Sequence, residues 1–102
     1  MDLIDNLEAM KLYDMYGNLL TKKQNKCLND YLLNNLTLSE ISEIYGISRQ
    51  EVNFYIKETL KLLNSYEEKL GLCQKYDTID MKLRKLNLSE ATINDIMGTL
   101  KE

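Results

Sequence analysis

The stretch TLSEISEIYGISRQEVNFYIKETLKLL, residues 37–63, decides the fold of this chain. Its apolar residues recur at intervals of three and four on both sides of Gly46, which predicts two helices separated by a tight turn. Glycine suits such a turn because a left-handed backbone costs it little. The stretch therefore predicts a helix-turn-helix, whose second helix could enter the major groove of DNA.

The side chains around Gly46 fit this motif one by one. Ser42 is a small residue at the position where the two helices are expected to cross. The residues expected to face the core are Ile41, Tyr45, Ile47, Val52 and either Tyr55 or Ile56. A plain helical hairpin can share some of these features by chance, but it rarely combines all of them with the capping signals described next.

Three helix starts carry the capping-box pattern, in which a hydroxyl residue precedes a carboxylate or amide residue by three positions. The pairs are Thr21 with Gln24, Thr37 with Glu40, and Ser48 with Glu51. The helices they predict run from Lys22 to about Asn34, from Leu38 to Tyr45, and from Arg49 onward. Apolar residues flank two of these caps as a hydrophobic staple requires, namely Leu36 with Ile41 and Ile47 with Val52.

Outside these helices the apolar periodicity predicts further helical segments. A first helix should run from Leu3 to about Tyr16, with Gly17 as its stop. Its apolar residues are Leu3, Ile4, Leu7, Met10 and Leu12. A short amphipathic piece is expected from Ile79 to Leu86, and a last helix should follow a cap at Ser89. The apolar face of that last helix carries Ile96, Met97 and Leu100.

The long helix that begins at Arg49 has no evident stop before Gly71. Its apolar stripe consists of Leu60, Leu63, Tyr66 and Leu70, and Cys73 and Tyr76 continue it. Such spacing suits a partner helix, so the stripe either pairs two copies of the chain or packs under the last helix of the same chain. The pattern predicts one all-α domain over residues 1–102, with a helix-turn-helix core (19–63) and a helical extension (64–102) that serves dimerisation.

The composition argues against catalysis and against a bound metal. The 102 residues include no proline, no histidine and two cysteines, so the commonest general base and the usual zinc ligand sets are missing. Cys27 and Cys73 both lie on apolar helical stripes, where a buried thiol is the expected role. We expect no enzyme activity, metal or cofactor, and, without a leader or an apolar span, a cytoplasmic protein.

The start of the helix after Gly46 carries the candidate DNA contacts. Arg49 can bind guanine through two hydrogen bonds, Gln50 and Asn53 can do the same with adenine, and Lys57 suits a phosphate. Any solvated helix face can carry such residues. Three lysines that precede the motif, Lys22, Lys23 and Lys26, are candidate phosphate contacts or ordinary surface charges.

The charge balance limits the expected affinity for DNA. The net charge of the whole chain is −3, whereas residues 20–63 carry six basic and five acidic side chains, a net of +1. About six phosphates at most could be neutralised, so binding should weaken early as salt rises. Glu51 can act as a cap rather than face DNA, but Glu58 has no such role and should oppose binding.

The segment from Leu19 to Leu72 resembles the YlxM family, small bacterial proteins with a helix-turn-helix similar to the promoter-reading fourth region of sigma factors. The likeness rests on LLTKKQ (19–24), LSEISEIYGISRQEV (38–52), Ile56 with Lys57, and LLNSYEEKL (62–70). The family is encoded beside the GTPase of the signal recognition particle, and the resemblance implies a DNA-binding protein with a possible link to that pathway.

Position by position, the family's second helix matches Arg49, Gln50, Val52, Ile56 and Lys57. Three positions depart from its pattern: Glu51 replaces a residue that is often small, Asn53 one that is often aromatic, and Glu58 one that is often basic. The change at residue 58 lowers the expected affinity for DNA more than it affects the fold.

Two classes of function follow from these observations. The first is a non-catalytic regulator that binds the major groove of duplex DNA as a homodimer, because two tethered modules bind better than one weakly basic module. The second is an interaction module of the signal recognition particle pathway, which binds protein through an acidic C-terminal face or binds RNA.

Overall fold

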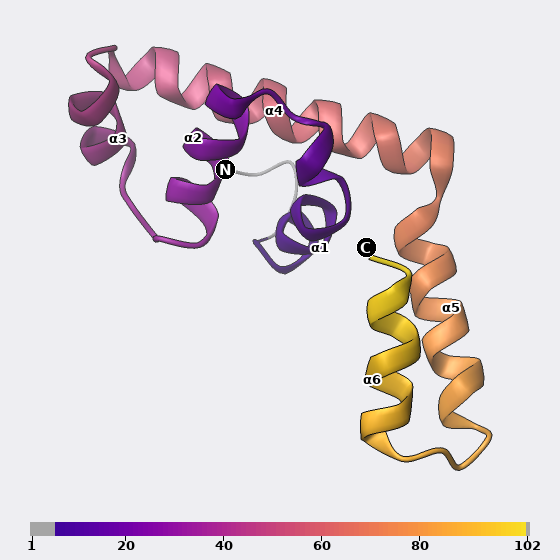
Figure 1. Cartoon of the computed structure of the whole chain (residues 1–102). Helices are drawn as coiled ribbons and strands as arrows, with labels where there is room; N and C mark the ends of the chain where they lie inside the picture. Colours follow the sequence, from indigo (N-terminus) through magenta and orange to yellow (C-terminus); the bar gives the residue numbers. More distant parts are fainter. Residues whose placement is uncertain (1–5, 102) are drawn as a thin grey trace.

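The computed structural model describes residues 6–101, which form six α-helices, one 3₁₀ turn and no strand. The elements are α1 (Asn6–Tyr16), η1 (Gly17–Leu19), α2 (Lys22–Leu32), α3 (Leu38–Tyr45), α4 (Arg49–Leu70), α5 (Leu72–Arg84) and α6 (Glu90–Thr99). The helices α1, α2 and α3 pack along α4, and α5 and α6 form a hairpin that leaves the far end of α4 at a steep angle (Figure 1). The predicted all-α helix-turn-helix fold is confirmed.

All three predicted capping boxes are present. Hydroxyl oxygens of Thr21, Thr37 and Ser48 accept hydrogen bonds of 3.0–3.1 Å from the backbone N–H three residues on. In each box the side chain of that third residue accepts a bond from the cap's own N–H. The starts of α2, α3 and α4 are therefore the predicted ones, because the signals that set them are local. Helix α2 ends at Leu32, two residues before the predicted end.

Two glycines adopt the left-handed conformation and set the bends of the chain. Gly46, with φ of 67°, ends α3 and makes the predicted turn into α4. Gly71, with φ of 63°, ends α4 and begins α5. The short segment predicted from Ile79 to Leu86 is wrong, since α5 already begins at Leu72 and ends at Arg84. No helix within residues 6–101 combines the length and apolar character needed to span a bilayer.

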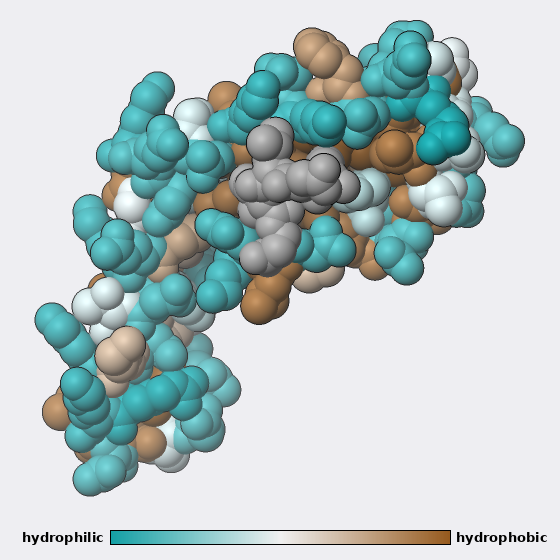
Figure 2. Space-filling view, turned by 180° about the vertical axis from the view of Figure 1, so that it is seen from behind, coloured by the Kyte–Doolittle hydropathy of each residue, from teal (hydrophilic) through white to brown (hydrophobic). Residues whose placement is uncertain are grey.

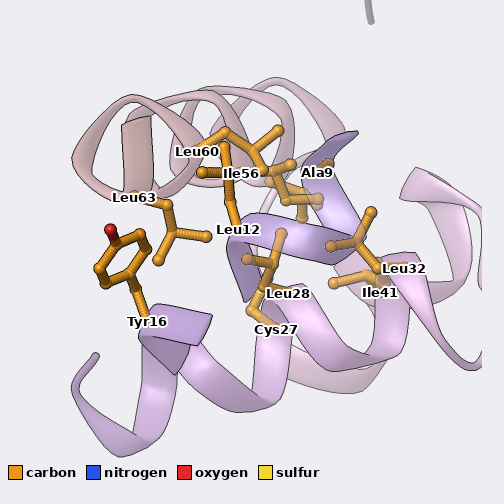
Figure 3. Close-up of a cluster of buried hydrophobic side chains, with 11 residues drawn as sticks. Ala9, Leu12, Tyr16, Cys27, Leu28, Leu32, Ile41, Ile56, Leu60 and Leu63 are labelled. Atoms are coloured by element: carbon orange, nitrogen blue, oxygen red, sulfur yellow. The ribbon is translucent and has the colours of Figure 1, made fainter. Parts of the chain in front are cut away.

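The core lies between α4 and the three helices packed along it (Figure 3). The buried side chains of α4 are Val52, Ile56, Thr59, Leu60 and Leu63. The residues that meet them from the other helices are Ala9, Leu12, Tyr16, Cys27, Leu28, Leu32 and Ile41. Tyr45, Ile47 and Tyr55 pack against the edge of this cluster, so the expected inward-facing residues of the motif do contact the core.

The predicted apolar face of the first helix is only partly correct. Leu12 is buried, but Leu7 is 69% exposed and Met10 is also exposed. Ala9 and Tyr16 face the core instead. They lie one turn before and one turn after Leu12, on the face of α1 that meets α4. Leu3 and Ile4, which the prediction included, lie outside the described residues.

The stripe that was a candidate for pairing two copies is largely covered by its own chain. Leu63 is buried in the core, and Tyr66 and Cys73 pack against it. The rings of Tyr16 and Tyr66 lie 5.9 Å apart between centroids, so α1 is what covers the stripe. The alternative that the last helix covers the stripe is wrong, because α1 does so. Pairing of two copies stays a prediction, and of the stripe on α4 Leu70 alone is exposed.

The α5–α6 hairpin buries few side chains. Ile93 and Met97 of α6 are buried, and α5 contributes none. Of the predicted face of the last helix, Ile96 and Leu100 are exposed. Hydrophilic side chains dominate the hairpin in the rear view (Figure 2). The proposed division into a core (19–63) and an extension (64–102) stays a prediction, and its boundary falls inside α4.

Candidate nucleic-acid interface

The start of α4 is fixed by Ser48 and Glu51. The Ser48 hydroxyl accepts a hydrogen bond of 3.0 Å from the N–H of Glu51, and the Glu51 carboxylate accepts one of 3.4 Å from the N–H of Ser48. The carboxylate therefore caps the helix, as expected, and lies beside the positive end of the helix dipole. This cap orients the first turn of α4, which carries Arg49 and Gln50.

The four candidate contacts on α4 lie on one side of the helix, within about 100° of one another. Arg49 and Gln50 are exposed, whereas Asn53 and Lys57 are half-buried along the edge of the core. Because successive residues turn by about 100°, Gln50 and Lys57 lie within about 20° of each other, and Asn53 lies about 40° from Lys57, nearer the core. None of the four forms an ion pair within residues 6–101, so Arg49 and Lys57 can bind an anion without breaking one.

Lys23 is held against the second helix of the motif. Its Nζ lies 5.7 Å from the centroid of the Tyr55 ring, a cation–π distance. Lys23 and Gln50 line the same cleft, of about 460 Å³, between the starts of α2 and α4. Lys22 and Lys26 are exposed on α2 but do not line this cleft. The structure thus brings Lys23 and Gln50 together and leaves the other two lysines apart.

Phe54 lines the same cleft and was missed by sequence reasoning. Its side chain is 66% exposed in the second turn of α4. The signal was available in the sequence: Phe54 is two residues from Val52 and two from Ile56, which places it about 160° from both buried positions. An aromatic residue at that angle belongs to the outer face of the helix.

Acidic groups adjoin this face. Glu58 is exposed and forms an ion pair of 3.5 Å with Lys61 on the surface of α4. Glu43 is exposed on α3. Asp30 instead has a structural role, since it accepts a bond of 2.9 Å from the Tyr45 hydroxyl and so joins α3 to α2. Burial and this bond raise the pKa of Tyr45 to about 12.

The cysteines belong to the scaffold. Cys27 is buried, as expected, and Cys73 is half-buried at the corner between α1 and α5. Burial raises the pKa of both thiols, that of Cys73 to about 11 with a further contribution from Glu67. Both are therefore neutral at physiological pH and poor nucleophiles. Within residues 6–101 no cluster of acidic or cysteine side chains could hold a metal ion.

The amino-acid sequence matches a family of known proteins. A family model named UPF0122, described as "Putative helix-turn-helix protein, YlxM / p13 like", matches residues 3–102. A UPF0122 protein of Caldanaerobacter subterraneus is 48% identical over 82 residues, which cover 80% of this chain and 70% of the relative. A UPF0122 protein of Listeria innocua is 37% identical over 88% of this chain and 88% of the relative. A UPF0122 protein of Bacillus cereus is 40% identical over 89% of this chain and 86% of the relative.

Proposed function

Since this chain belongs to the UPF0122 family of YlxM/p13-like helix-turn-helix proteins, we propose that it is a cytoplasmic, non-catalytic regulatory protein that binds duplex DNA through α4. The observation that carries the proposal is the geometry of the turn. Gly46 redirects the backbone and Ser48 caps a helix whose first side chains, Arg49 and Gln50, are exposed and unpaired within the described residues. Arginine and glutamine at that position can bind the edges of guanine and adenine.

The remaining candidates have positioning roles in this proposal. Lys57 and Asn53 lie along one edge of α4, and Lys23 lies on the opposite side of the motif, over Tyr55. Lysines on both sides of a groove-binding helix can bind the two phosphate strands and so fix the register of the helix. Lys22 and Lys26 extend the phosphate contacts along α2.

A fluorescence-anisotropy titration tests this function. The probes are a duplex carrying the promoter of the protein's own gene and a random duplex of equal length, at low and at moderate salt. The double variant Arg49→Ala, Gln50→Ala should remove the preference for the promoter. The matched control, Gln74→Ala with Lys75→Ala, removes one amide and one cation from the exposed surface of α5 and should retain it. A wild-type protein without preference, or a double variant that keeps it, contradicts the proposal.

We further propose that the hairpin pairs two copies of the chain. Residues 72, 76, 79 and 83 of α5 repeat at intervals of four and three, the spacing that a partner helix fits. Leu72, Ile79, Ile96 and Leu100 are each 38–47% exposed. Helix α1 holds a different flank of the hairpin through Lys11–Asp77 and Asp14–Lys101. Tyr76 lies under Lys101 of the same chain and Leu83 is half-buried. Leu72, Ile79, Ile96 and Leu100 form the part of the flank that is open to a second hairpin.

Light scattering tests the pairing. Ile79→Asp should convert a dimer to a monomer because it places a charge within the apolar flank. Met81→Asp is the control, since Met81 is also apolar and exposed, 59% against 38% for Ile79, but lies about 160° away around α5. A monomeric wild-type protein, or an Ile79→Asp variant that remains dimeric, contradicts this arrangement.

The second candidate function is an interaction module that binds a protein of the signal recognition particle pathway or its RNA. The observation in its favour is the strip formed by Glu51 and Glu58, which lie seven residues apart on one side of α4. Such a strip suits a basic protein partner better than a nucleic acid. If the anisotropy titration detects no duplex binding, this candidate replaces the first.

A further inference from the structure

Phe54 is the feature of α4 that packing does not explain. Its neighbours Val52 and Ile56 are buried in the core, whereas Phe54 is 66% exposed. Neither α2 nor α3 covers it, although its side chain lines the cleft between the starts of α2 and α4. The side chain therefore contributes little to folding and remains available to a ligand of the same face.

The surroundings of Phe54 are those of a base-reading surface. Gln50 lies one helical turn earlier, and Lys23 lines the far side of the same cleft. The cleft thus combines an amide that can bind a base edge, a cation that can bind a phosphate, and an apolar ring. Glu51 also lines it, and its carboxylate accepts the capping bond from the N–H of Ser48. A partner that satisfies all three groups must offer a hydrogen-bonding edge, an anion and an apolar group close together.

The major groove of duplex DNA presents these three groups together. Its phosphates flank the groove, adenine offers N6 and N7 to an amide, and thymine offers its C5 methyl group to an apolar side chain. Thymine is the only base of unmodified DNA with such a methyl group. We propose that Phe54 packs against a thymine methyl group while Gln50 binds an adenine, so that this face selects duplexes rich in A·T pairs.

This inference rests on the proposed function, and the helix geometry adds a spacing to it. Gln50 and Phe54 are four residues apart, about 6 Å along the axis of α4. Base pairs are stacked about 3.4 Å apart. The thymine that contacts Phe54 therefore lies about two base pairs from the pair that Gln50 reads.

The test begins with selection from a pool of randomised DNA duplexes at low salt. In the enriched duplex each thymine is then replaced, one at a time, by deoxyuridine, which lacks only the C5 methyl group. One replacement should weaken binding of the wild-type protein about three- to fivefold, the effect expected for exposing one buried methyl group. That position should lie about two base pairs from one at which adenine is preferred.

Variants then assign the two contacts. Phe54→Ala should bind the thymine and deoxyuridine duplexes equally and keep the adenine preference. Gln50→Ala should lose the adenine preference and keep the sensitivity to the methyl group. Leu70→Ala, which removes another exposed apolar side chain about 24 Å further along α4, should change neither. Circular dichroism of each variant checks that the helices are intact.

The outcomes separate the two proposals. If no sequence is enriched, the proposed function fails and the role of Phe54 fails with it. If a sequence is enriched but no thymine is sensitive to its methyl group, or Phe54→Ala keeps the sensitivity, only the role of Phe54 is overturned. Tighter binding of single-stranded DNA that depends on Phe54 also overturns it, in favour of base stacking on the ring.

Discussion

The hydroxyl of Tyr16 donates a hydrogen bond of 2.5 Å to Oε1 of Glu67, which joins α1 to the last turns of α4. The same hydroxyl accepts a bond of 3.0 Å from the N–H of Leu72, the first residue of α5. Glu67 in turn accepts bonds from the N–H groups of Cys73 and Gln74. One tyrosine and one carboxylate thus cap the start of α5, at a corner where Gly71 offers no side chain.

Removing either partner should destabilise the corner. Tyr16→Phe keeps the buried ring but removes one of the three donors to Glu67 and the acceptor of the Leu72 N–H, so we expect the free energy of unfolding to fall by about 1–3 kcal/mol. Glu67→Gln should cost a similar amount, and the double variant should cost less than the sum. Urea denaturation measures all three. The control is Tyr31→Phe, because the Tyr31 hydroxyl has no hydrogen-bond partner within residues 6–101; an equal loss there would contradict this account.

Stability should also fall in acid through Glu67. Burial alone would raise the pKa of this carboxyl, but the hydrogen bonds from Tyr16 and from the N–H groups of Cys73 and Gln74 outweigh it and hold the pKa below the ordinary 4.5. A depressed pKa means that the contribution of Glu67 is complete above pH 4.5 and is lost as the pH falls through the lower, folded-state value. Denaturation midpoints measured from pH 6 to pH 3 should show this loss, and Glu67→Gln should reduce it.

Two glycine substitutions should have opposite effects on stability. Gly46→Ala forces a side chain into a backbone with φ of 67°, and no atom within 4 Å would clash, so the cost is the backbone strain of about 1–2 kcal/mol. Gly98→Ala lies in α6, also with free space around it, and should stabilise by about 0.5–1 kcal/mol because alanine favours a helix. Thermal denaturation compares them. Equal effects at the two sites would contradict the conformational reason.

The phosphate role of Lys57 predicts a defined salt dependence. Lys57→Ala should weaken binding to all duplexes alike and reduce the slope of log K against log salt by about one. Lys75→Ala on α5 is the control and should leave the slope unchanged. A Lys57 variant that alters sequence preference while keeping the slope would show that Lys57 contacts a base instead.

Neutralising Glu58 should strengthen binding. Glu58→Gln removes a negative charge from the exposed surface of α4 and releases Lys61 from its ion pair. We expect the affinity for duplex DNA to rise about two- to fivefold at low salt, with a smaller gain at high salt. Glu68→Gln makes the same change about 15 Å further along the helix and should have little effect. If Glu58→Gln weakens binding, the partner is a basic surface rather than DNA.

The local features of the fold were predictable from the sequence. The three capping boxes and the turn at Gly46 occur as expected, because each depends on residues at most a few positions apart. The same reasoning reached Arg49 and Gln50 as exposed residues. The capping boxes and the turn do not depend on what packs against each helix, so the folded chain shows them where the sequence predicts them.

The predictions that were wrong concern features that depend on contacts between residues far apart in the sequence. Nothing within the first helix indicates that α4 will select Ala9 and Tyr16 rather than Leu7 and Met10. The apolar spacing continues through Gly71 in the sequence, although the chain turns a corner there. The sequence near Gly71 does not reveal this corner, because the bond that fixes it joins Tyr16 and Glu67, 51 positions apart. Phe54 is different, since the helical angle that separates it from Val52 and Ile56 could be calculated from the sequence alone.

The two left-handed glycines also give α4 a constant length. Gly46 lies three residues before the first residue of α4 and Gly71 directly after its last, and the 22 residues of the helix span about 33 Å. Surface substitutions along this rod can alter what it touches without moving either boundary. The distance between the turn at Gly46 and the α5–α6 hairpin is therefore fixed by the backbone, and substitutions on the exposed side of α4 leave it unchanged.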